Sequence, residues 1–178
     1  MDKNKSAYKL KGFPPVYYIN LDGEPERKMY MEAQLKYWEI EDYTCISAYD
    51  GREDDLSDII KGKYPDMMSS CEIGCTTSHL KAIKHWYDTS DTPYAIIMED
   101  DCNLDTVKCW NFTWKDFIAK VPYAWDVIQL AIIFARINKS KDIWNNLNTY
   151  FKWGEVRDVG SCLAYVINRK CAIEVLNF

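Results

Sequence analysis

Three consecutive acidic residues, Glu99, Asp100 and Asp101, directly follow a short apolar segment at 94–98. Three carboxylates at the end of a buried strand repel one another unless a cation neutralises them. Mg²⁺ and Mn²⁺ prefer such oxygen ligands and usually keep coordination positions open for phosphate oxygens. Because side chains alternate along an extended chain, we expect Glu99 and Asp101 to point to the same side. They could then bind one ion together, or one ion and a ribose. The alternative is a solvated acidic turn in which Asp101 caps a helix.

A second group of polar residues surrounds the first predicted strand–helix turn. Asn20, Asp22 and Arg27 flank this turn, and Asp50 ends the second predicted strand in the same way. Helix N-termini bind anions, and Arg contacts phosphate through two parallel hydrogen bonds, so the turn could hold a nucleotide. An ordinary surface turn would have the same composition.

Seven cysteines are scattered along the chain, and no CxxC pair occurs. Cys71, Cys75 and His79 are spaced by four residues, which would line them along one face of a helix. A zinc site needs a fourth ligand, which the sequence does not identify, so we interpret the thiols as reduced, mostly buried packing residues. A single His within a helix is also typical of packing, although it could serve a site.

Composition narrows the classes of partner. The chain has 178 residues and a net charge of −5, and its basic residues form no stripe that could follow a phosphate backbone. Nucleic acid is therefore not an expected partner. No apolar run approaches the ~20 residues of a membrane span, and no apolar signal segment follows the polar N-terminus, so we expect a cytoplasmic protein. The absence of a P-loop and of GxGxxG disfavours an NTPase or a Rossmann dehydrogenase.

The elements that must position these residues alternate between strand and helix. Segments rich in β-branched and aromatic residues predict strands at 16–21, 43–48, 94–98, 126–131 and 162–167. Helical spacing of apolar residues predicts helices at 25–38, 72–88 (capped by Ser69 or Ser70), 113–120 and 169–177, with a short helix at 56–60 inside an irregular loop. This alternation predicts a doubly wound α/β sandwich, in which ligands bind at the carboxyl ends of the strands.

Five motifs, in order and spacing, resemble glycosyltransferase family 25, which includes bacterial lipooligosaccharide galactosyltransferases and collagen-modifying galactosyltransferases. They are Tyr18–Asp22, Pro25–Arg27, Ala48–Gly51, Glu72–Cys75 with Ser78–Leu80, and Ile96–Asp101. Segments 125–130 and 160–167 are similar to the family's subsequent strands, so the resemblance spans roughly residues 15 to 175.

The resemblance implies a GT-A type fold with a mostly parallel central sheet flanked by helices. It implies a hexose donor, UDP-galactose or UDP-glucose, and inverting transfer to a carbohydrate or hydroxylated acceptor, as in lipopolysaccharide biosynthesis. It also implies Mn²⁺, or Mg²⁺, bound through Glu99 and Asp101. The residues that it places around the donor are Asn20, Asp22, Arg27, Asp50 and Asp100, with Ser78 and His79 lining the donor pocket or bracing the acidic loop.

A carboxylate on the opposite face of the sugar would take the proton from the acceptor hydroxyl. The candidates are Asp126, Glu155 and Asp158, each of which could also be an ordinary loop acid. Family members usually continue beyond the region that ends here at Phe178. We therefore expect one domain over 1–178, which could be truncated in its acceptor-binding part.

Two other functions remain open. A non-catalytic module could keep the fold and bind a nucleotide-sugar or carbohydrate without turnover. A structural domain could carry an acidic loop that is only solvated. The clustered acids favour the enzyme, because a protein without a ligand gains little from carboxylates that repel one another.

Overall fold

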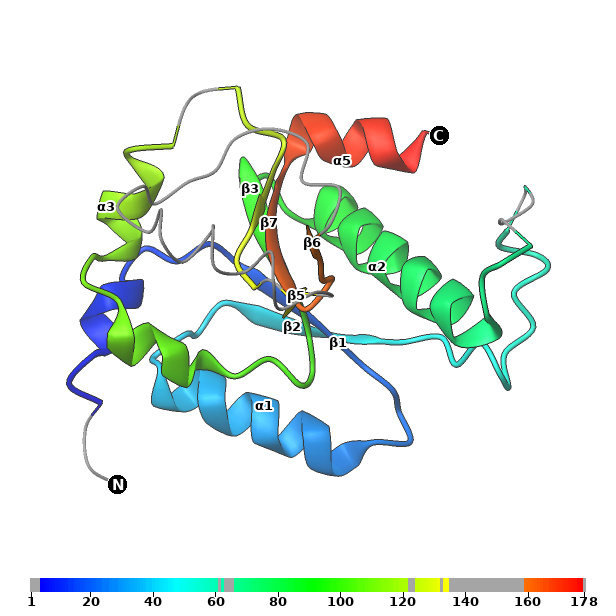
Figure 1. The fold of residues 1–178 in the computed structure, drawn as a ribbon, viewed down its shortest axis with the longest axis horizontal. Coiled ribbons are helices and arrows are strands. Elements are labelled where there is room, and N and C mark those ends of the chain that lie inside the picture. Colours follow the sequence, from blue (N-terminus) through cyan, green and yellow to red (C-terminus); the bar gives the residue numbers. More distant parts are fainter. Residues whose placement is uncertain are drawn as a thin grey trace.

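A five-stranded sheet forms the centre of the computed structural model, which describes residues 4–60, 62, 66–121, 124–131, 133–134 and 159–177 (Figure 1). The strands are β1 (Val16–Asn20), β2 (Tyr43–Ser47), β3 (Tyr94–Glu99), β4 (Val127–Gln129) and β7 (Ala164–Asn168), in the order β2-β1-β3-β7-β4. β1 pairs in parallel with β2 and β3, whereas β7 runs antiparallel to β3 and β4. Strands β1 to β4 therefore share one direction, and β7 opposes them.

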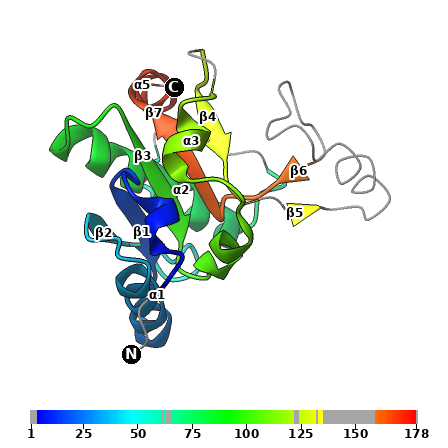
Figure 2. The same cartoon turned by 90° about the vertical axis from the view of Figure 1, so that its left-hand side faces the viewer.

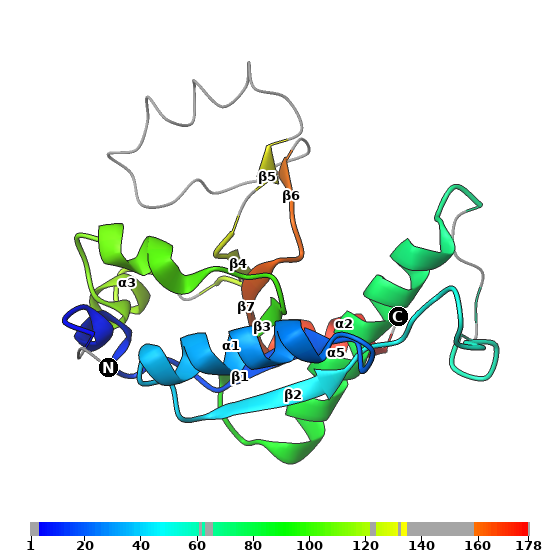
Figure 3. The same cartoon turned by 90° about the horizontal axis from the view of Figure 1, so that it is seen from below.

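Helices cover both faces of the sheet. One face carries α1 (Pro25–Tyr37), α3 (Trp114–Ile118) and two 3-10 helices, η1 (Ala7–Leu10) and η2 (Leu104–Cys109). The other face carries α2 (Ser70–Thr89) and α5 (Arg169–Leu176); Figure 3 views the layers from the side of α1. Side chains of β1 alternate between the two layers, because Tyr18 packs in the cluster that contains α1 and Tyr17 packs in the cluster that contains α2.

The connections around β1 make the fold doubly wound. The chain passes from β1 to β2 through α1, and from β2 to β3 through α2. Because β2 and β3 lie on opposite sides of β1 and the two helices cover opposite faces, the winding reverses at β1. The carboxyl ends of these three strands therefore meet at a switch point, where ligands of α/β sheets commonly bind. The predicted α/β sandwich is confirmed, with β7 as the antiparallel member of the sheet.

The predicted strands and longer helices are confirmed with small differences at their ends. The short helix predicted at 56–60 is wrong. This segment forms a single turn, in which Leu56 O accepts from Ile59 N at 3.0 Å and from Ile60 N at 2.9 Å, and no helix forms. A separate two-stranded sheet, β5 (Ile133–Phe134) with β6 (Val159–Gly160), was not expected and lies to one side of the main sheet (Figure 2).

Helix α2 begins at a capping box. Ser69 Oγ accepts from Glu72 N, and the Glu72 carboxylate accepts from Ser69 N at 2.7 Å, which selects Ser69 from the two serines predicted as the cap. The helix is 20 residues long, but polar and charged residues interrupt its apolar face. None of the helices in the described part of the chain has both the length and the apolar run needed to cross a bilayer.

Candidate functional site

A cavity of about 200 Å³ opens where β1, β2 and β3 end. Its lining includes six of the residues predicted to form the site: Arg27, Asp50, Ser78, His79, Glu99 and Asp100. A larger hollow of about 1050 Å³ lies at the opposite edge of the sheet, around η1 and the loop before β2. None of the predicted site residues that the structure describes lines that hollow, so the smaller cavity is the candidate site.

Two glycines bring the first turn of α2 against the loop that follows β2. A Cβ on Gly74 would lie 2.5 Å from Gly51 N, and a Cβ on Gly51 would lie 1.9 Å from Ser70 O. Ser78 reinforces this contact, because its hydroxyl donates to Gly74 O at 2.7 Å and accepts from Tyr49 N at 2.8 Å. Ser78 therefore lines the cavity and braces the loop after β2, rather than the acidic loop.

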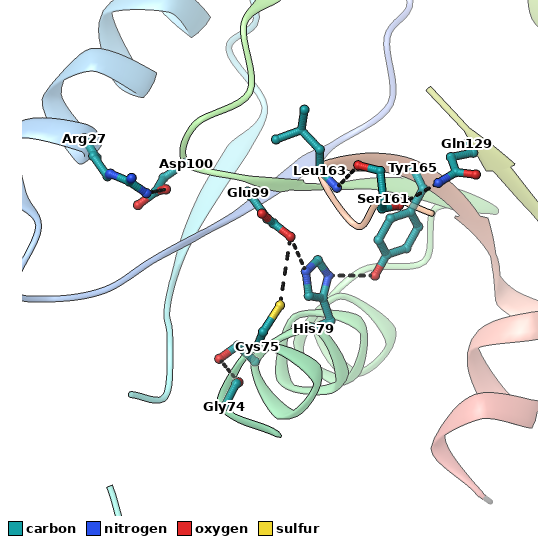
Figure 4. Close-up of polar contacts among 11 residues, drawn as sticks. Arg27, Gly74, Cys75, His79, Glu99, Asp100, Gln129, Ser161, Leu163 and Tyr165 are labelled. Atoms are coloured by element: carbon teal, nitrogen blue, oxygen red, sulfur yellow. Dashed lines mark hydrogen bonds and ion pairs between the residues drawn. The ribbon is translucent and has the colours of Figure 1, made fainter. Parts of the chain in front are cut away.

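Asp100 connects the ends of β1 and β3 to α1. Its carboxylate accepts from Asn20 Nδ2 at 2.7 Å and from Arg27 Nη1 at 3.0 Å (Figure 4 shows the ion pair). Asn20 Nδ2 also donates to Glu24 O at 3.1 Å, so the buried Asn20 side chain supports the start of α1. The Arg27 side chain is 53% exposed and lines the cavity. The hydrogen bond to Asp100 and the negative charge of that carboxylate raise the pKa of Arg27, so the guanidinium at this wall stays charged.

Glu99 faces α2 and β7. Its Oε1 lies 3.3 Å from His79 Nε2 and 4.0 Å from Cys75 Sγ (Figure 4). The other ring nitrogen, His79 Nδ1, lies 3.1 Å from Tyr165 Oη. The buried His79 ring therefore connects β7 to the end of β3, and both of its nitrogens have polar partners. His79 is not a residue of apolar packing; it lines the cavity and braces the acidic loop.

Asp101 lies differently from the prediction. The strand ends at Glu99, and residues 100–101 form a turn, so the alternation of an extended chain stops there. Asp100 rather than Asp101 lines the cavity beside Glu99. Burial and the negative charge of Glu99 nevertheless raise the pKa of Asp101. The expected shared face of an extended segment is wrong, whereas the expected repulsion between the two carboxylates is present.

The chain matches, over residues 13–178, the model of a family described as glycosyltransferase family 25 (LPS biosynthesis protein). It belongs to this family. No curated protein sequence matches the chain. The match confirms the resemblance carried by the five motifs, and with it a glycosyltransferase activity. An enzyme of this kind uses a nucleotide-sugar donor and a glycan acceptor.

Several residues predicted to serve this glycosyltransferase lie outside the cavity. Asp22 accepts from Ser47 Oγ at 2.9 Å, a contact that ties the end of β1 to the end of β2. The Asn20 side chain donates its hydrogen bond to Asp100 and does not line the cavity. Both are therefore structural neighbours of the cavity in this conformation, and their predicted contacts with nucleotide stay predictions.

Asp126 is at the wrong edge of the sheet to act as the base. Its carbonyl accepts from Asn168 N, and β7 pairs Asn168 with Tyr94, the first residue of β3. Asp126 is thus level with the start of β3, which puts it about 16 Å from Glu99 along the strand direction at ~3.3 Å per residue. Its carboxylate instead forms an ion pair with Lys170 at 3.4 Å. The other two candidates, Glu155 and Asp158, lie outside the described residues.

Sequence reasoning missed one cation of the cavity. Arg52 lines it and forms a bidentate pair with Asp50, through Nε–Oδ1 at 2.9 Å and Nη2–Oδ2 at 2.6 Å. This pairing holds the pKa of Asp50 at about 2, so Asp50 stays charged and is neutralised by Arg52. The side chain of Arg52 is 61% exposed and could also reach a phosphate. The only signal in the sequence is an Arg two residues after the Asp of a turn.

The cysteines were also misjudged. Cys102 is buried and Cys45 and Cys171 are partly buried, whereas the other four, Cys71, Cys75, Cys109 and Cys162, are exposed. Cys71 and Cys75 line the cavity from successive turns of α2. The four-residue spacing gave the right face of the helix, but the expectation of mostly buried thiols is wrong.

Proposed function

We propose that this family 25 glycosyltransferase moves a hexose from UDP-galactose or UDP-glucose to a hydroxyl of a glycan, with inversion, on a fold of the GT-A type. The observation that supports it is the convergence of Arg27, Arg52, Glu99 and Asp100 in one cavity at the switch point of the sheet. Two guanidinium groups suit a diphosphate, and the carboxylates suit a cation or sugar hydroxyls.

The donor would occupy the cavity through its diphosphate. Small-molecule sites commonly measure about 300–1,000 Å³, so a cavity of about 200 Å³ holds only part of a nucleotide-sugar. The charged walls support the phosphates as that part, between Arg27 on α1 and Arg52 after β2. The N-terminus of α1 follows the same strand end and favours negative charge there. The nucleoside and the hexose would extend beyond the cavity.

Glu99 and Asp101 together offer the oxygen ligands that Mn²⁺ and Mg²⁺ prefer. Burial and, after it, the negative charge of Glu99 raise the pKa of Asp101, and a divalent cation bound by both carboxylates would remove the repulsion between them. The donor set therefore fits the cation that the family resemblance implies. When bound, such a cation neutralises charge on the departing diphosphate.

Inversion requires one displacement at the anomeric carbon. The acceptor oxygen forms its bond as the bond to the diphosphate breaks, and a base takes the hydroxyl proton on the face opposite the leaving group. The position of Asp126, level with the start of β3, argues against this role. Glu155 and Asp158 remain the candidate bases, and the residual rates of Glu155→Gln and Asp158→Asn would identify the one that acts.

Thermal unfolding with UDP, UDP-galactose and UDP-glucose, with and without Mn²⁺, tests the donor site. A ligand at ~100 times its Kd adds about 2.7 kcal/mol to the unfolding free energy, which raises Tm by several degrees at this size. We expect a shift that depends on Mn²⁺ and that Arg27→Ala reduces, whereas its exposed neighbour variant Lys28→Ala keeps it. No shift with any UDP compound would refute the proposed donor. A shift without release of UDP on incubation with glycan acceptors would favour a non-catalytic binding module.

A further inference from the structure

Potential metal ligands of a second kind gather on the α2 side of Glu99. Ligand atoms of Cys75, His79 and Glu99 all lie within 4.8 Å of one another. Cys75 and His79 are one turn apart on α2, and Glu99 ends β3. A fourth donor is available in the segment before β7, because the thiol of Cys162 neighbours that of Cys75, although Cys162 lies outside the group of three whose ligand atoms are within 4.8 Å. The four-residue spacing of Cys75 and His79 thus acquires the partners that the sequence alone did not identify.

The chemistry of these four donors differs from that of the acidic loop. Two sulfurs, one imidazole nitrogen and one carboxylate oxygen suit Zn²⁺, whereas Mg²⁺ and Mn²⁺ favour oxygen alone. Metal–ligand bonds of about 2.0–2.3 Å put tetrahedral ligands about 3.3–3.8 Å apart. The His79 Nε2–Glu99 Oε1 distance of 3.3 Å falls in this range. The Cys75 Sγ–Glu99 Oε1 distance of 4.0 Å is slightly longer, and a small rotation of the cysteine side chain would shorten it enough.

The surroundings of His79 also suit a metal ligand. Its Nδ1 has Tyr165 Oη as a partner at 3.1 Å, which leaves Nε2 directed at Glu99 and Cys75 (Figure 4). Histidines that bind metals commonly hydrogen-bond through their second nitrogen, because this contact fixes the orientation of the ring. The His79 side chain is only 9% exposed, whereas the two cysteines are exposed, so an ion could enter from the cysteine side.

We infer that Cys75, His79, Glu99 and Cys162 form a binding site for a thiophilic divalent cation of the Zn²⁺ type beside the donor cavity. Binding would release the thiol protons to solvent and leave both sulfurs as thiolate ligands. The site does not depend on the proposed donor, because all four ligands come from the chain. It shares Glu99 with the proposed Mn²⁺ site, so one carboxylate stands between two sets of donors.

Co²⁺ is the probe that reads this site directly. The whole chain, reduced and metal-free, is titrated with Co²⁺ and followed by absorbance, without nucleotide. We expect one equivalent to produce a thiolate-to-cobalt charge-transfer band and intense visible bands of tetrahedral cobalt, and Zn²⁺ to abolish both. Cys75→Ser and Cys162→Ser should each lose about half of the charge-transfer intensity and weaken Co²⁺ binding at least ~tenfold. Cys109→Ser, which changes an exposed cysteine on the other face of the sheet, should match the wild type.

Circular dichroism would show whether a variant folds poorly. In that case the cobalt spectrum of the wild type alone still tests the inference. A weak octahedral spectrum without a charge-transfer band would overturn the inference. So would a charge-transfer band that survives unchanged in both cysteine variants, since the thiolates would then come from elsewhere. Failure of UDP to bind would count against the proposed donor and leave the cobalt result unaffected, so the two proposals fail separately.

Discussion

The carboxylate of Asp100 ties three elements together, and its removal tests how the site is built. It accepts hydrogen bonds of 2.7 Å from Asn20 Nδ2 and 3.0 Å from Arg27 Nη1. Asp100 is 7% exposed and Asn20 is 3% exposed, so water can replace little of what the substitution removes. We therefore expect Asp100→Ala to lower the free energy of unfolding, even though the residue lines the candidate site.

The size of the loss follows from the two contacts. A hydrogen bond to a charged group contributes about 1.5–3 kcal/mol, which applies to the buried contact with Asn20. The ion pair with Arg27 adds only about 0.2–1 kcal/mol, because the Arg27 side chain is 53% exposed and solvent screens the charge. The expected total is about 3 kcal/mol, or a fall in Tm of ~6–12 °C for a chain of this length.

Urea unfolding followed by circular dichroism measures this loss, and the next residue provides the control. Asp101 is exposed, so Asp101→Ala should change the unfolding free energy by no more than about 0.5 kcal/mol. Binding of UDP in the presence of Mn²⁺ should nevertheless weaken in Asp101→Ala, because Asp101 is a proposed cation ligand. A loss below about 1 kcal/mol in Asp100→Ala, or equal losses in the two variants, would refute the assignment of Asp100 as the structural clamp.

Three further predictions concern the walls of the site. Gly74→Ala should cost about 1–3 kcal/mol in urea unfolding and weaken UDP binding, because the new Cβ would lie 2.5 Å from a backbone nitrogen of the facing loop. Gly23→Ala, whose Cβ meets nothing within 4 Å, is the control, and equal losses would contradict the close-approach argument. The pKa of Asp101 is raised above its ordinary value of 3.8. The free energy of unfolding therefore falls as the pH rises from 3.8 through the raised pKa of the folded protein. Asp101→Asn should therefore gain stability over wild type in that interval, as unfolding between about pH 3 and 7 would measure, and parallel curves would refute the repulsion. Asp126→Asn should leave the transfer rate unchanged, and a fall of more than ~tenfold would return Asp126 to the candidate bases.

The fold could be predicted largely from local patterns. The unbroken apolar run 94–98 and the helical spacing of 72–88 are properties of neighbouring residues, and both appear in the structure as expected. The direction of β7 could not be predicted, since an apolar segment has the same composition in a parallel or an antiparallel pair. The segment 56–60 resembles a helix in its apolar spacing, but it forms only a turn, and the neighbouring Asp55 carboxylate accepts a local hydrogen bond from Ser57 N.

The sequence allowed us to predict which strand ends form the site, but not which side chains contact each other there. Parallel strands bring their carboxyl ends together, which is why residues near 20, 50 and 99 were rightly grouped. The contact between Asn20 and Asp100 spans 80 residues, and nothing in either segment alone specifies it. The thiols were misjudged for the same reason, because the partners of Cys75 lie on β3 and before β7. Only tertiary structure shows that its helix face turns toward a carboxylate and a second thiol.

Glu99 belongs to both proposed metal sites, so the two cations should exclude each other. Its Oε1 is the oxygen that faces His79 and Cys75, and a soft cation bound there would draw the carboxylate toward α2. Free Zn²⁺ at about nine times its own Kd should then raise the apparent Kd of Mn²⁺, measured through UDP binding, about tenfold. Cys75→Ser should keep the Mn²⁺ dependence and lose the Zn²⁺ effect. If saturating Zn²⁺ left the Mn²⁺ requirement of the wild type unchanged, Glu99 could not be a ligand of both ions, and one of the two ligand sets would be wrong.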